Sequence, residues 1–181
     1  MPPPPTLETA RLILRPLGWE DLDALCRLHA EASFWWYPFQ RGMTDDETRR
    51  FLERTLETYV VDGVALSAAV VKETGELAGW IGLAVPLFLP EILPAVEVGW
   101  RLGERFRGLG YATEGATAAV HYAFHDAGLD RLVSIYDPSN VASVRVMEKL
   151  GFTFERQTVH PVRGEVLRVY QLTRQEWVAA T

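Results

Sequence analysis

The chain has 181 residues, of which 48% are hydrophobic and 23% charged, so it is long enough for one domain and too apolar to be disordered. A formal net charge of −6 argues against nucleic-acid binding through bulk charge, and no run approaches the ~18 uninterrupted apolar residues of a membrane span. The single cysteine, Cys26, excludes an intrachain disulfide and a multi-cysteine zinc site, and it favours a cytoplasmic protein.

The first third of the chain predicts one strand and two helices. Residues 1–6 form a proline-rich arm that we expect to be flexible, at the start of a single domain spanning residues 1–181. Arg11–Leu17 alternates apolar and polar residues as a strand does, whereas Trp19–Glu31 has apolar residues near helical spacing. Thr44–Glu47 is a capping box and predicts a helix that ends near Val61.

The remainder alternates strand-like and helix-like segments. Strands are predicted at 65–72, 77–85, 95–102, 131–137, 152–160 and 165–173, and helices at 111–127 and 140–150. This order, βααβββαβαββ, predicts one mixed sheet flanked by helices, which is an α/β or α+β fold.

A glycine-rich turn joins the strand at 95–102 to the helix at 111–127. Gly108 and Gly110 would let the backbone close on a phosphate, and the start of a helix offers unpaired amides and about half a positive charge. Arg101, Arg105 and Arg107 fall close to this turn. The turn lacks the lysine of a Walker loop and the third glycine of a Rossmann fingerprint. A diphosphate is the ligand that fits best, although an ordinary tight turn would share these features.

Two further places could carry chemistry. Glu97 lies among apolar residues in its predicted strand and shares a face with Gly99 and Arg101. It would either pair with an arginine such as Arg101 or line a cleft as a general base. Asn140 is a good helix N-cap with Ser143 one turn later, a pattern that capping alone would also explain.

Taken together, these segments resemble the GCN5-related N-acetyltransferases (GNAT), and within them the ribosomal-protein alanine and serine N-acetyltransferases. The acyl-CoA signature of that family, Arg/Gln-x-x-Gly-x-Gly/Ala, reads Arg105–Gly110 (RFRGLG) here. The second signature reads Asn140–Ser143 (NVAS) followed by Glu148–Phe152 (EKLGF). The resemblance starts at Leu7–Leu12 (LETARL) and continues to the last strand.

The resemblance implies a fold and a co-substrate. The fold is a mixed, mostly antiparallel sheet of about six or seven strands with about four helices, whose fourth and fifth strands splay apart to admit the pantetheine arm. The co-substrate is acetyl-CoA or another acyl-CoA, and no metal is expected. The residues implied to bind it are Val98, Gly99, Trp100, Arg105, Phe106, Arg107, Gly108, Leu109, Gly110, Tyr111, Ala112, Asn140 and Ser143.

The resemblance also implies direct transfer to an amine. Ser143 would protonate the leaving thiolate, since Met147 stands where many family members have a tyrosine. The attacking amine must be neutral. At neutral pH about one lysine amine in ~2,500 is neutral, compared with roughly one α-amine in six to ten. Glu97, acting through a water molecule, is the candidate base.

The acceptor is predicted to be a small-molecule amine or a protein N-terminus. Trp35, Trp36 and Tyr37 lie where the family places its acceptor site, although a core plug or a dimer contact would explain them as well. No nucleic acid or membrane partner is expected, and a homodimer is left open. The alternative function is a non-catalytic acyl-CoA-binding module on the same fold.

Overall fold

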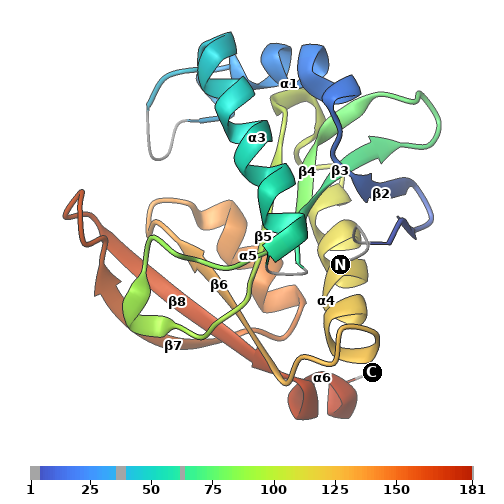
Figure 1. Ribbon diagram of the computed structural model, residues 1–181. Coiled ribbons are helices and arrows are strands. Elements are labelled where there is room, and N and C mark those ends of the chain that lie inside the picture. Colours follow the sequence, from blue (N-terminus) through green and yellow to red (C-terminus); the bar gives the residue numbers. More distant parts are fainter. Residues whose placement is uncertain (1–4, 36–39, 62–63, 181) are drawn as a thin grey trace.

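The computed structural model describes residues 5–35, 40–61 and 64–180 (Figure 1). Its α-helices are α1 (Leu22–His29), α3 (Asp45–Val61), α4 (Tyr111–His125), α5 (Val141–Lys149) and α6 (Arg174–Ala180). Its strands are β1 (Leu7–Glu8), β2 (Leu12–Pro16), β3 (Leu66–Val71), β4 (Leu77–Ala84), β5 (Glu97–Leu102), β6 (Arg131–Tyr136), β7 (Thr153–Val159) and β8 (Val166–Thr173). Within the described ranges, no helix combines the length and the apolar character needed to cross a membrane.

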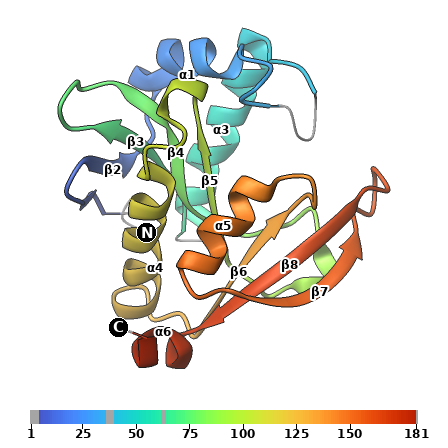
Figure 2. The ribbon, with the colours of Figure 1, turned by 180° about the vertical axis from the view of Figure 1, so that it is seen from behind.

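The strands form one sheet in the order β1-β2-β3-β4-β5-β6-β8-β7. All neighbours are antiparallel except β5 and β6, which are parallel and share a single register pair, Glu97 with Val133. Beyond that pair the two strands separate, and Figures 1 and 2 show β6, β7 and β8 turned away from the rest of the sheet. The predicted mixed sheet with two splayed central strands is therefore confirmed.

The helices cover both faces of the sheet. Helices α4 and α5 pack over one face, and α1 and α3 cover the other face near β3 and β4 (Figures 1 and 2). The main core lies under α4, whose alanines at 116, 119 and 123 are almost fully buried. Gly115 allows this close approach, since a Cβ there would lie 2.4 Å from Ile81 Cδ1. This packing places the N-terminus of α4 close to the C-terminal end of β5.

The sequence patterns did not predict two elements, β1 and α6. The sheet therefore has eight strands, not six or seven, and the described residues include five α-helices, not about four. Strand β1 is only two residues long, which is too short to show an alternating pattern. Helix α6 did have a signal. The Thr173 amide donates to Glu176 Oε2 at 2.8 Å, and the Glu176 amide donates to Thr173 Oγ1 at 3.2 Å. This is the same capping box that was predicted correctly at Thr44–Glu47.

Candidate functional site

A cavity of ≈ 590 Å³ lies where β5 and β6 separate. Glu97, Gly99 and Arg101 of β5 line it, as expected for residues on one face of a strand. Asn140 and Ser143 line it too, from the first turn of α5. The opening between the two strands thus brings together the two predicted catalytic residues, which are 46 positions apart in the printed sequence.

Glu97 begins β5 at its single register pair with β6. Loss of hydration in the cavity wall raises the pKa of its carboxyl to about 7, although the Ile135 amide and the charge of Arg101 both act to lower that pKa. Arg101 also lines the cavity, but its guanidinium contacts the opposite wall: Nη1 donates to the Phe34 carbonyl at 2.6 Å, and the guanidinium lies 4.2 Å from the centre of the Trp35 ring. This geometry favours the cleft-lining role for Glu97 over an ion pair with Arg101.

Asn140 and Ser143 are arranged by the start of α5. Asn140 Oδ1 accepts a hydrogen bond from the Ser143 amide at 3.2 Å, so the predicted N-cap is present. The cap uses the backbone of Ser143 and leaves its hydroxyl out of the capping bond. Met147, one turn later, is fully buried and also lines the cavity, where it supplies no acid. Capping and cavity lining are therefore compatible roles for this pair.

The glycine turn lies at the other end of β5. Gly108 and Gly110 have positive φ values of 74° and 84°, and α4 begins directly after them. Among the described residues, the backbone amides of positions 108 to 113 find no hydrogen-bond acceptor. A row of unpaired amides at a helix N-terminus suits a phosphate group. Because β5 separates this turn from Glu97 by roughly 17 Å, only an extended ligand could reach both.

Arg11 contacts this turn and stabilises it, a role that the sequence patterns did not predict. Its Nη1 donates to the Leu109 carbonyl at 2.9 Å, and its guanidinium lies 4.7 Å from the centre of the Tyr111 ring. Its Nε also donates to Glu114 Oε2 at 2.7 Å. Burial tends to raise the pKa of Glu114, but hydrogen bonds from Thr9 and Arg11 outweigh it and lower that pKa. No local spacing could reveal this contact, because its partners lie about 100 positions apart.

The three arginines near the turn do not form one cluster. Arg105 pairs with Glu76 at 2.8 Å, and Arg107 donates to the carbonyls of Leu102 and Ser33 at 2.9 and 2.7 Å. Arg101 lines the cavity instead, away from the glycine turn. Phosphate contacts from Arg105 and Arg107 stay predictions.

Of the predicted acceptor aromatics, Trp35 is described and Trp36 and Tyr37 lie outside the described residues. Trp35 is 7% exposed and packs against His29, Phe51 and Trp80 in the second core, between α1, α3 and the sheet. It does not line the cavity. In this structure Trp35 supports the wall that holds Arg101.

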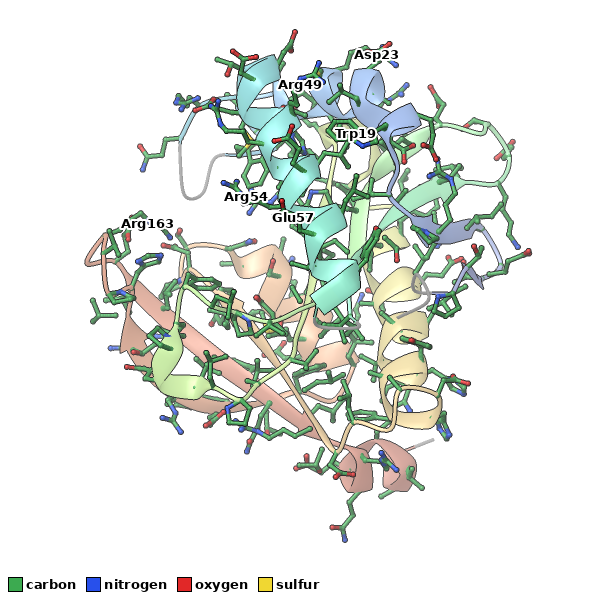
Figure 3. The ribbon with its side chains drawn as sticks, viewed as in Figure 1. Trp19, Asp23, Arg49, Arg54, Glu57 and Arg163 are labelled. Atoms are coloured by element: carbon green, nitrogen blue, oxygen red, sulfur yellow. The ribbon has the colours of Figure 1, made fainter. Side chains whose placement is uncertain are left out.

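Three further residues line the cavity and were not predicted from the sequence patterns. They come from elements that lie far apart in the sequence. Arg54 of α3, and His160 and Arg163 beside the β7–β8 turn, all line it, and Figure 3 shows Arg54 and Arg163 on opposite sides of the opening. In the part of the chain that the structure describes, no group of three or more His, Cys, Asp or Glu side chains could hold a metal ion. The candidate site is therefore a cleft of titratable and basic side chains, with a row of unpaired backbone amides at the far end of β5.

Comparisons with known proteins identify the family of the chain. Residues 11–153 match a family model described as an acetyltransferase (GNAT) domain. The FsC-acetyl coenzyme A-N(2)-transacetylase of Aspergillus fumigatus is 33% identical, over 96% of this chain and 78% of its own. The structure is similar to that of an acetyltransferase from Agrobacterium tumefaciens, with a TM-score of 0.76 and 32% identity over 93% of this chain and 94% of the other.

The fold is also that of the ribosomal L7/L12 α-N-protein acetyltransferase RimL, solved in complex with coenzyme A. That structure has a TM-score of 0.74 and 21% identity over 93% of this chain and 96% of its own. The family match covers most of the chain. The chain belongs to the GNAT acetyltransferase family and is an acyl-CoA-dependent N-acetyltransferase.

Proposed function

We propose that the protein transfers an acetyl group from acetyl-CoA to a primary amine by direct attack, with both substrates bound at once. The observation that carries this proposal is the continuous cavity, which has Glu97 on one wall and Ser143 on another, at the opening between β5 and β6. A single cavity that holds a candidate base and a candidate acid can accept a proton on one side of the reacting carbon and return one on the other.

The residues present suit an extended acyl-CoA. The unpaired amides of positions 108 to 113 would hold the pyrophosphate, and the amide side chain of Asn140 would bond the pantetheine arm beside β5. Backbone groups of Val98, Gly99 and Trp100 would line the path of that arm. In these assignments acyl-CoA extends along β5 from the glycine turn to Glu97.

Acetyl transfer exchanges one bond at the thioester carbon for another. The neutral amine attacks the thioester carbon, so that a C–N bond forms and the C–S bond breaks. Glu97 takes the proton from the amine, directly or through a water molecule, and a carboxyl pKa of about 7 suits a base that works near neutral pH. The sulfur leaves as a thiolate that is stabilised by a hydrogen bond from the Ser143 hydroxyl and then takes up a proton from solvent, while Glu97 returns its proton to solvent.

The relatives do not agree on one acceptor. The Aspergillus fumigatus relative is named for an N(2) nitrogen, RimL for a protein α-amine, and a 28% identical Escherichia coli relative for spermidine N(1). All three names indicate transfer to nitrogen. We therefore infer an amine acceptor, either a small molecule or a protein N-terminus.

The test measures acetyl-CoA binding and thiol release with the same purified full-length protein. Calorimetry should detect acetyl-CoA binding, and a panel of amines and N-terminal peptides should yield acetyl-CoA-dependent thiol release. Absence of acetyl-CoA binding would contradict the proposal. Binding without thiol release across the whole panel would favour the non-catalytic acyl-CoA-binding module instead.

A further inference from the structure

We take the part of the cavity away from α5 as the acceptor side, and it is lined by basic side chains from three separate elements. Arg54 comes from α3, Arg101 from β5 and Arg163 from the turn between β7 and β8. The carboxylates that line the cavity are Glu97 and Asp137. Asp137 Oδ1 accepts the Ser139 amide at 2.8 Å in the turn before α5, so it belongs to the Ser143 side. The acceptor side is therefore positively charged although the whole chain carries −6.

Arg54 is the least compensated of the three arginines. It is exposed and has no ion pair or hydrogen bond with any residue that the structure describes. Arg163, by contrast, pairs with Glu165 at 3.2 Å, and Arg101 donates to the Phe34 carbonyl at 2.6 Å. Figure 3 shows Arg54 projecting from α3 toward the lobe that carries Arg163, with Glu57 one turn further along α3. Glu57 does not line the cavity.

His160 adds a neutral hydrogen-bond donor to the cavity lining, on the same lobe as Arg163. Its Nδ1 accepts the backbone amides of Val162 and Arg163 at 3.2 and 3.3 Å, so the ring proton must be on Nε2. Burial, together with the charge of Arg163, lowers the pKa of His160 and keeps the ring neutral. The ring is held in place by stacking on Phe88 at 5.6 Å. An Nε2–H fixed in this way donates a hydrogen bond and cannot act as a base.

We propose that the acceptor amine carries an anionic group, a carboxylate or a phosphate, which pairs with Arg54, while the Nε2–H of His160 across the opening offers a further hydrogen bond to the bound acceptor. A guanidinium fork matches the oxygen atoms of either anion. A polycationic acceptor would instead meet the three arginines that line the cavity. This inference rests on the proposed amine acetyltransfer and names its substrate class.

The test compares matched acceptors in acetyl-CoA-dependent thiol release by the full-length protein. The pairs are leucine with leucinamide, phenylalanine with phenylalaninamide, and O-phosphoethanolamine with ethanolamine, and spermidine serves as the polycation. The anionic member of a pair should have a kcat/KM about tenfold higher or more. The preference is diagnostic because the carboxylate raises the pKa of its own amine and leaves less of it neutral. A leucine or phenylalanine preference would identify the anion as a carboxylate, and an O-phosphoethanolamine preference as a phosphate.

Two substitutions on one helix assign the effect to Arg54. Arg54→Gln should lower kcat/KM for the anionic acceptor about tenfold and leave the uncharged partner and the KM for acetyl-CoA unchanged. Arg49→Gln is the matched control, because Arg49 is exposed on the same helix, lies 5.9 Å from the Trp19 ring and does not line the cavity.

Equal or better activity with the uncharged partners or spermidine would overturn the inference and leave the proposed function intact. The same conclusion would follow if Arg54→Gln affected both members of a pair equally. Thiol release with none of the amines would instead contradict the proposed function, and the inference would fall with it.

Discussion

The proposed donor and acceptor parts of the site are built in different ways. The donor part uses backbone groups from short continuous segments, namely the amides that follow Gly108 at the far end of β5 and the capped first turn of α5 at the cavity. The acceptor side uses side chains from α3, β5 and the β7–β8 turn, elements that lie far apart in the sequence. On the proposed assignments, acyl-CoA binding depends on local backbone geometry, whereas acceptor choice depends on side chains that the fold brings together from distant segments.

Removing the carboxylate where the two sides meet should have the largest effect. Glu97→Gln should lower kcat about 100-fold, because the amine then loses its base. In the wild type, the pH–rate profile should bend near pH 7, where Glu97 becomes ionised and active. That bend should disappear in the variant, which steady-state kinetics between pH 5.5 and 9 would show.

The same variant should gain stability while it loses activity. The pKa of Glu97 is raised on folding, so its contribution to stability is present below the unfolded-state pKa and is lost as the pH rises through about 7. Glu97→Gln should therefore stabilise the protein at pH 8, by on the order of 2 kcal/mol, and change little at pH 4. Destabilisation at pH 8 would indicate a structural carboxylate and contradict the catalytic assignment.

On the donor side, Ser143→Ala should lower kcat about 30-fold, because the departing sulfur loses a charge-assisted hydrogen bond. The Kd for acetyl-CoA, measured by calorimetry, should stay unchanged. The helix cap survives this substitution, since Asn140 accepts from the Ser143 backbone. An unchanged kcat would remove Ser143 from the mechanism.

A pair of glycines separates ligand binding from backbone strain. Gly108→Ala should raise the Kd for acetyl-CoA about tenfold by disturbing one phosphate-binding amide. Gly128→Ala is matched to it, because the φ values are 74° and 72° and a Cβ at either position meets nothing within 4 Å. Both variants should lose about 1 kcal/mol of stability. If Gly128→Ala weakened acetyl-CoA binding equally, the glycine turn would have no specific role.

The smallest effect is expected at the brace on the glycine turn. Arg11→Gln should cost about 0.5–1 kcal/mol of stability, because the ion pair with Glu114 is partly exposed to solvent. It should also weaken acetyl-CoA binding less than Gly108→Ala does. Arg156→Gln, which removes an exposed pair with Glu155 on the distant strand β7, is the control for a general effect of charge. Equal changes in acetyl-CoA affinity would argue against the brace.

The contrast between the two sides also explains what the sequence could predict. The order of most elements along the chain, the capping box at Thr44 and the glycine turn follow from periodicity, spacing and φ preference, which act over a few residues. Glu97 stood out as a carboxylate among apolar residues. Arg11 and Arg54 gave no such signal, because each is an ordinary surface arginine until the fold brings its partners or its cavity to it.

The most direct test of direct transfer is an initial-rate study that varies acetyl-CoA and an accepted amine together. A ternary complex in one cavity predicts intersecting lines in double-reciprocal plots. Parallel lines would contradict it, because they require an acyl-enzyme and therefore a nucleophile. Cys26, the one cysteine in the chain, does not line the cavity, and burial together with the nearby Asp45 raises the pKa of its thiol. The account therefore predicts intersecting lines that Cys26→Ser leaves unchanged.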